Sequence, residues 1–267
     1  MLSNITLGQY YPGDSAIHRL DPRIKIVLSI AFIVGVFLVK DLLGYGLALM
    51  YILLTVRMST VPFKLLAKGI KPLRFILILT FLLNLLFSSG ETVLFRVWFI
   101  TVTWEGLSTA VHFSLRLVFL VLGTSLLTLT TSPVALADGL ELLLTPLKVI
   151  RFPAHELAMM MTIALRFIPT LLEEADKIMK AQMARGADFE SGNLLARARA
   201  MVPLLVPLFV SAFRRASDLA MAMEARCYHG GENRTRLRVL KVKRLDGYAC
   251  LVTAGMIVLI VVEGMLL

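Results

Sequence analysis

The chain has 267 residues, of which 58% are hydrophobic and 17% are charged, and its formal net charge at pH 7 is +10. Its mean hydropathy of +0.80 means that it holds more apolar surface than a soluble domain of this length can bury in one core. The composition therefore excludes an ordinary soluble protein. Because positive charge in a membrane protein gathers on one side of the bilayer, we expect contact with lipid and no nucleic acid as a partner.

Five apolar runs are each long enough to approach or cross a hydrocarbon core about 30 Å thick. They are residues 24–39, 42–56, 75–87, 107–131 and 247–267. The polar residues before the first run carry no small-residue cleavage site after a short apolar stretch, so we expect no cleaved signal peptide. Several runs are short, and we expect Lys25, Lys40, Arg57 and Arg74 to complete them by snorkelling toward water.

The basic residues between the runs predict the orientation, because Lys and Arg are retained on the cytoplasmic side. Arg19, Arg23 and Lys25 precede or open the first run, whereas the first and third connections contain only Lys40 and Arg96. Five basic residues link the second run to the third: Arg57, Lys64, Lys68, Lys71 and Arg74. This pattern predicts a multi-pass protein of the cell membrane, with the N-terminus in the cytoplasm and the C-terminus outside.

The predicted fold is all-α and polytopic, with about five transmembrane helices. Residues 1–131 form an N-terminal membrane domain of four spans, residues 132–246 form three cytoplasmic coupling helices, and residues 247–267 form the last transmembrane helix. The cytoplasmic segment holds 17 of the 28 Lys and Arg residues. An alternative places residues 157–172 and 201–213 in the bilayer, which would leave the orientation unchanged and raise the count to seven spans.

The first cytoplasmic helix is predicted to open at Ser132, which can cap free N–H groups, and Pro133, which suits a first helical position. The second starts at Pro153 and runs to Gly186 through Pro169, where we expect a kink. Its first half is apolar, and its second half carries the pairs Glu173/Lys177 and Asp176/Lys180 at the favourable i, i+4 spacing.

The third cytoplasmic helix is predicted to open near Asn193 and to pass kinks at Pro203 and Pro207 before it reaches Arg226. Its end is similar to that of the second helix when the two are offset by 41 residues. The aligned pairs are Ala175 with Ala216, Ala181 with Ala222, Ala184 with Ala225 and Arg185 with Arg226.

Each of these two helices ends in Ala-Arg followed by a small residue, Ala184-Arg185-Gly186 and Ala225-Arg226-Cys227. An arginine at a helix end with little bulk around it can reach into a groove and pair bidentately with carboxylates or cap carbonyls. A simpler interpretation stays open, because a basic residue in the last turn also complements the helix dipole.

Several motifs taken together closely resemble the transmembrane T component (EcfT/CbiQ-like) of energy-coupling factor (ECF) type ABC transporters. They are Arg166-Phe167-Ile168-Pro169, Glu173-Glu174-Ala175, Ala184-Arg185-Gly186-Ala187-Asp188, Glu224-Ala225-Arg226, His18-Arg19-Leu20-Asp21-Pro22-Arg23 and Thr130-Thr131-Ser132-Pro133. The resemblance covers nearly the whole chain.

The resemblance implies that Arg185 and Arg226 each dock into a groove on one of two ABC ATPase subunits. It also implies a substrate-binding integral membrane subunit, and ATP-driven uptake of a vitamin or a metal ion. ATP and Mg would be bound by the partner subunits, so we expect no cofactor and no metal site in this chain. The family more often has glycine at the position of Cys227, which weakens the role assigned to Arg226.

The rival interpretation is a stand-alone membrane channel or enzyme, which would need several ionisable groups at membrane depth. Only Arg116, His112 and Glu263 are candidates. Arg116 has either an intramembrane function or a structural role in which it bonds to carbonyls or to a polar neighbour. No catalytic residues are predicted, because His155-Glu156 lacks the second histidine of a zinc-protease motif and no phosphate-cradling G-x-x-x-x-G-K-[ST] motif occurs.

Overall fold

The computed structural model describes residues 10–88, 92–97, 100–150, 152–189, 193–230 and 240–266. The chain divides into two compact units. One, the membrane unit, comprises Gly8–Leu140 and Leu240–Leu267, and the other, the helical-pair unit, contains Glu141–Val239. The domain boundaries predicted at residues 131 and 246 stay predictions.

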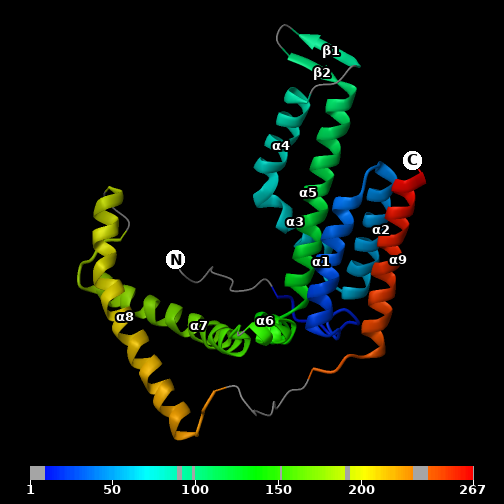
Figure 1. The fold of residues 1–267 in the computed structure, drawn as a ribbon. Coiled ribbons are helices and arrows are strands. Elements are labelled where there is room, and N and C mark those ends of the chain that lie inside the picture. Colours follow the sequence, from blue (N-terminus) through cyan, green and yellow to red (C-terminus); the bar gives the residue numbers. More distant parts are fainter. Residues whose placement is uncertain are drawn as a thin grey trace. The chain divides into compact units, whose positions relative to one another are not determined.

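The membrane unit is built from long helices. Its elements are α1 (Pro22–Leu38), α2 (Leu42–Ser59), α3 (Phe63–Ile70), the 3-10 turn η2 (Lys71–Leu73), α4 (Arg74–Phe87), strands β1 (Val93–Val97) and β2 (Ile100–Thr103), α5 (Trp104–Thr130) and α9 (Arg244–Leu266). Helices α1 and α2 each pack against both α5 and α9, and α4 packs along α5 (Figure 1). Helix α6 (Pro133–Leu144) follows α5.

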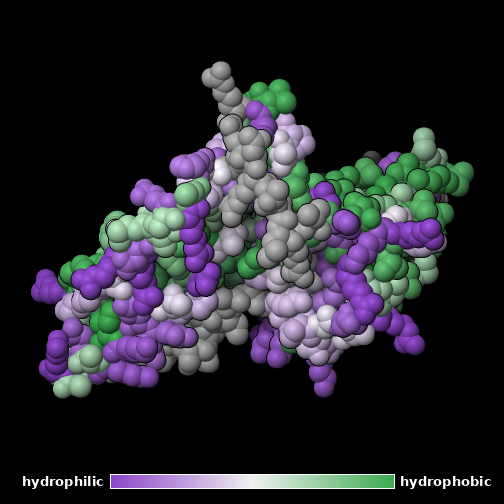
Figure 2. Space-filling view, turned by 90° about the horizontal axis from the view of Figure 1, so that it is seen from below, coloured by the Kyte–Doolittle hydropathy of each residue, from purple (hydrophilic) through white to green (hydrophobic). Residues whose placement is uncertain are grey.

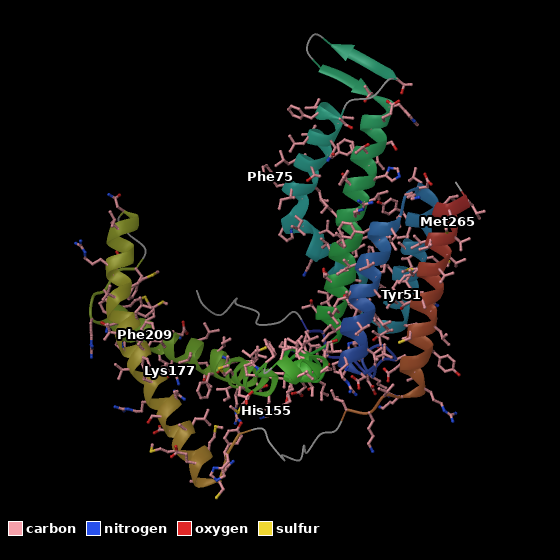
Figure 3. All side chains as sticks on the ribbon, in the orientation of Figure 1. Tyr51, Phe75, His155, Lys177, Phe209 and Met265 are labelled. Carbon is pink, nitrogen blue, oxygen red and sulfur yellow. The ribbon has the colours of Figure 1, made fainter. Side chains whose placement is uncertain are left out.

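The core of this unit lies where α1, α2, α5 and α9 meet. Phe32, Val36, Ala48 and Ile260 are almost completely buried there. Much of the outer apolar surface is exposed instead, and Phe75 projects from α4 away from α5 (Figure 3). A bundle with a small core and apolar side chains on its outside fits a hydrocarbon solvent.

Asp21 fixes the start of α1. Its carboxylate accepts the backbone N–H of Arg23 at 2.9 Å, and Pro22 occupies the first helical position, where its missing N–H costs no helical hydrogen bond. The Arg23 guanidinium donates to the same carboxylate at 2.9 Å and lowers the pKa of Asp21. The prediction that Lys25 snorkels to water is wrong: its side chain is buried, and Nζ donates to the backbone oxygen of Thr130 at 2.9 Å.

The all-α, polytopic class is confirmed, although the number of candidate spans differs from five. Six helical runs in the described ranges are long and apolar enough to cross a membrane: Leu42–Ser59, Phe63–Phe87, Trp104–Thr130, Ala154–Ala184, Arg199–Ala225 and Arg244–Leu266. Helix α1, which matches the first predicted run, has 17 residues and is not among them. Two of the six lie in the segment predicted to be cytoplasmic, and its location stays a prediction.

Two further features differ from the sequence analysis. The basic link before the third predicted span is helical, because α3 and η2 continue into α4, and Leu66 of α3 is fully buried. Strands β1 and β2 pair antiparallel between α4 and α5, with Val93 paired to Thr103, which we did not predict.

The helical-pair unit contains the 3-10 turn η3 (Thr145–Ile150), α7 (Ala154–Ala184) and α8 (Leu194–Ala225). Ser132 Oγ accepts the N–H of Ala135 at 3.3 Å just before this unit, which confirms the predicted start of α6. Helices α7 and α8 cross and pack against each other (Figure 1). In the left part of Figure 2, where they lie, hydrophilic and hydrophobic side chains are interspersed.

Candidate functional site

The candidate site consists of the ends of α7 and α8. We call Ala184, Arg185 and Gly186 the first tip, and Ala225, Arg226 and Cys227 the second tip. All six residues are exposed, and both arginines stand directly after the last helical residue. Arg185 and Arg226 therefore project where another protein can reach them.

The first tip ends α7 with a Schellman motif. Gly186 N–H donates to the Met183 oxygen and Ala187 N–H donates to the Gln182 oxygen, each at 3.0 Å. This motif requires a left-handed residue directly after the cap, and Gly186 has φ +89°. An added side-chain carbon at Gly186 would meet no atom within 4 Å. Glycine is therefore required here by the left-handed backbone conformation and not by lack of space for a side chain.

The second tip ends α8 in the same way. Cys227 N–H donates to the Glu224 oxygen at 2.8 Å, and Tyr228 N–H donates to the Met223 oxygen at 3.1 Å. Cys227 has φ +56°, although it carries a side chain that disfavours this conformation. The 41-residue similarity seen in the sequence thus extends to the hydrogen bonds that end both helices.

The three prolines assigned as kinks lie inside continuous helices. Pro169 lies in α7, and Pro203 and Pro207 lie in α8. Each lacks the N–H that would close a helical turn. Asn193 directly precedes α8 as predicted, but its side chain makes no capping hydrogen bond.

Polar contacts join α7 to α8. The Glu174 carboxylate accepts hydrogen bonds from the Ser211 hydroxyl and from Arg215, whose Nη2 lies 3.0 Å from Oε2. The predicted pair Asp176/Lys180 forms at 3.1 Å. The contact through Glu174 links the helical stems of the two tips, and the sequence analysis did not predict it.

A chain of three side chains connects the second tip to the start of α7. His155 Nδ1 lies 2.9 Å from Glu141 Oε1, and the Tyr228 hydroxyl lies 3.4 Å from His155 Nε2. Because a carboxylate only accepts, Nδ1 carries a proton, and in the neutral imidazole Nε2 then accepts from the tyrosine hydroxyl. Glu141 and His155 are mostly buried, with 10% and 20% of their side chains exposed. Ala187 takes the place of Tyr228 at the first tip and has no polar side chain for such a bond.

A hollow lies beside the second tip. Met159 and Ile163 of α7 and Leu219 and Met223 of α8 line it, together with Arg226 and the residues that follow. One methionine from each of the two helices, Met159 and Met223, therefore contributes to the same surface.

Arg116 lies in α5, in the membrane unit. Its Nη2 donates to the Val39 oxygen at 3.3 Å, and its guanidinium lies 5.3 Å from the Phe37 ring and 5.6 Å from the Phe113 ring. These contacts are those of the structural alternative, while an intramembrane function of Arg116 stays a prediction. Within the described ranges, no group of three or more His, Cys, Asp or Glu residues is arranged to hold a metal ion.

Comparison with known proteins decides the family. The family model CbiQ, described as "Cobalt transport protein", matches residues 13–237. The chain belongs to the CbiQ family of transport proteins. Among its curated relatives is the energy-coupling factor transporter transmembrane protein EcfT of Thermosediminibacter oceani, which is 56% identical over 252 residues, covering 94% of this chain and 95% of the relative.

Two other relatives carry the same name. The protein of Clostridium kluyveri is 55% identical over 252 residues, covering 94% of this chain and 93% of the relative. The protein of Bacillus subtilis is 52% identical over 240 residues, covering 90% of this chain and 91% of the relative. The resemblance inferred from the motifs is therefore confirmed, and this CbiQ-family chain is a multi-pass membrane protein with a role in transport.

Proposed function

We propose that this chain is the transmembrane coupling subunit of an ECF-type ABC importer. Two ABC ATPase subunits bind it, one at Arg185 and one at Arg226, and a substrate-binding integral membrane subunit completes the complex. ATP and Mg are bound by the ATPases, and the chain itself carries no cofactor. The cargo is a vitamin or a metal ion.

The observation that carries the proposal is the matching pair of tips. Each places an exposed arginine directly after a long helix, and each ends in the same two hydrogen bonds. Two equivalent arginines on crossing helices suit two related partner surfaces, and the rigid fork of a guanidinium suits a groove with carboxylates or free carbonyls. The names of the relatives support an energy-coupling role.

The links between the helices support transmission of movement. Glu174 ties α7 to α8 through Ser211 and Arg215, so displacement of one tip by an ATPase is passed to the other helix. The basic residues near the N-terminus support a cytoplasmic N-terminus and an outer C-terminus. With residues 132–246 in the cytoplasm, as proposed, both tips lie on the side where ATP is available.

Affinity purification of the detergent-solubilised chain from its own cells tests the proposal. Wild type is compared with Arg185→Ala, Arg226→Ala and the double variant, and Arg214→Ala, an exposed arginine in the middle of α8, is the matched control. We expect ATPase subunits to be retained by wild type and the control, reduced in each single variant and lost in the double variant. A well-folded wild-type chain that never retains an ATPase would refute the proposal and favour a channel or enzyme.

A further inference from the structure

A groove in the membrane unit has no role in the proposed coupling. It has a volume of about 180 Å³ and is enclosed by α1, α2, α5 and α9. Leu28 of α1 and Leu126 of α5 line it, together with Ala16, Ile17 and Leu20, which precede α1. Its lining is almost entirely apolar.

An aromatic stack forms part of the lining of the groove. The rings of Phe32 and Tyr51 are stacked with their centroids 5.4 Å apart, and the Tyr51 hydroxyl lies 2.9 Å from Thr253 Oγ1, which joins α2 to α9. Tyr51 lies among the helices of the bundle (Figure 3). Beyond this contact, the lining residues Leu54 and Met58 of α2 and Leu245 and Val252 of α9 are 42–48% exposed. The groove therefore opens sideways, between α2 and α9.

The charged residue in the lining cannot bind a polar ligand. It is Lys25, and its Nζ donates to the His18 oxygen at 3.3 Å, to the Thr130 oxygen at 2.9 Å and to Thr131 Oγ1 at 3.2 Å. An ammonium group has three donors, so all of them are used. An apolar hollow whose charged group is already fully hydrogen-bonded is a poor site for water, and its natural occupant is a hydrocarbon chain.

The mouth of the groove is basic. Lys241, Lys243 and Arg244 are exposed and directly precede Leu245, which lines the groove. The carboxylate nearby in sequence, Asp246, is 1% exposed and turned inward, where it accepts the N–H groups of Asp21 at 2.9 Å and Lys243 at 2.6 Å. The exposed charge beside the mouth is therefore positive, and basic residues at a membrane surface attract anionic lipids.

We propose that this groove binds one acyl chain of an anionic phospholipid. The chain enters between α2 and α9, and its terminal methylene groups lie against Leu28 and Leu126. The phosphate contacts Lys241, Lys243 and Arg244. Tyr248, which lines the mouth and is 65% exposed, lies where amphipathic rings meet lipid headgroups. The site is lined by α1, α2 and α9 among other elements, and it contains no residue of either tip.

Photo-crosslinking of the full-length chain in nanodiscs tests the proposal. The probe is phosphatidylglycerol with a diazirine at the end of one acyl chain, and phosphatidylcholine with the same label is the neutral comparison. Ala249→Phe fills the groove, whereas Ala254→Phe adds the same ring to an exposed position of α9 outside the lining. Leu54→Trp narrows the mouth at a half-exposed residue and serves as a second blocking variant. Monodisperse gel filtration is required of each variant.

We expect the phosphatidylglycerol label to map to peptides of α1 and α5 in wild type and Ala254→Phe. In Ala249→Phe and Leu54→Trp this labelling should fall at least about fivefold, which corresponds to a loss of ~1 kcal/mol of binding free energy. Replacing Lys241, Lys243 and Arg244 together by Gln should lower the preference for phosphatidylglycerol over phosphatidylcholine about tenfold or more. Equal labelling in the filling and control variants would overturn the site. Equal labelling by the two lipids in wild type would overturn the anionic ligand, and crosslinking of the groove to a co-purified membrane protein would assign it to that partner.

Discussion

Exchange of the residues that follow the two arginines should move the stability of the tips in opposite directions. Gly186 and Cys227 have the same place in two equivalent motifs, with φ +89° and +56°. Cys227→Gly removes a side chain from a left-handed position, and Gly186→Cys introduces one. Cys227 is exposed, and the added carbon at Gly186 meets no atom within 4 Å. Packing therefore changes little in either variant.

The magnitude follows from two opposing effects on the backbone. A residue with a side chain costs roughly 1–2 kcal/mol in the left-handed conformation, while glycine loses about 0.5–1 kcal/mol more conformational entropy on folding. Cys227→Gly should therefore stabilise the end of α8 by roughly 0.5–1 kcal/mol, and Gly186→Cys should destabilise the end of α7 by the same amount.

Hydrogen exchange measured by mass spectrometry reports this local stability. A free-energy change of 0.5–1 kcal/mol corresponds to roughly two- to fivefold in protection. We expect slower exchange of the peptide containing residues 227 and 228 in Cys227→Gly, and faster exchange of the peptide containing residues 186 and 187 in Gly186→Cys. Each peptide is the control for the other variant. Slower exchange at the first tip in Gly186→Cys, or faster exchange at the second tip in Cys227→Gly, would refute the backbone explanation.

Three further predictions follow from other contacts. Tyr228→Phe removes the hydroxyl bonded to His155 and should weaken ATPase retention about two- to fivefold. The same substitution should have no effect on retention in the Arg226→Ala background. An equal loss of retention in that background would contradict the prediction. Lys25→Met leaves buried carbonyls without a donor and should cost roughly 2–3 kcal/mol in thermal unfolding, whereas Lys40→Met, at an exposed residue with one bond to a carbonyl, should cost under about 1 kcal/mol. Arg23 lowers the pKa of Asp21 in the folded chain, so this carboxylate stabilises the fold at pH values above its ordinary pKa near 3.9. That contribution is lost as the pH falls through the lower pKa of the folded state. The melting temperature of Asp21→Asn should therefore decrease less on acidification than that of wild type.

Patterns that act along a single helix could be predicted from the sequence. Ser132 is predicted as a helix cap, and the structure gives it the expected hydrogen bond to the N–H of Ala135. Arg185 and Arg226 were placed at helix ends because Ala-Arg-small sequences precede a break, and both stand at the C-terminal cap. Such signals depend on residues three or four positions apart in the chain, so they can be recognised in a single sequence.

Helix α3 and the strand pair of β1 and β2 were not predicted, although the sequence contains signals for both. Residues 63–70 were treated as a basic link because Lys64 and Lys68 interrupt the apolar run. These lysines lie four residues apart on an exposed face, while Leu66 faces the core, and this is the spacing of an amphipathic helix. Residues 93–103 are rich in β-branched and aromatic types, which favour strands, but their place between two apolar runs indicates only a connection between spans.

Contacts between distant residues could not be predicted. Lys25 was expected to reach water because it stands at the end of a short span, yet it bonds to Thr130, 105 residues away. The chain from Glu141 through His155 to Tyr228 joins three elements, and no periodicity relates them. Only the folded arrangement brings these groups together.

The two tips indicate what the ends of α7 and α8 have to preserve. Glycine at one and cysteine at the other are different solutions to the same backbone requirement, and the second is the more costly one. Both still close with the same pair of hydrogen bonds, so the helix ends at the arginine in each case. At the second tip, the bond from Tyr228 to His155 adds a contact that the first tip has no side chain to make. This contact holds the residue directly after Cys227 and can offset the weaker backbone preference there. The backbone that follows Arg226 is thus held by a contact with α7 as well as by the end of α8.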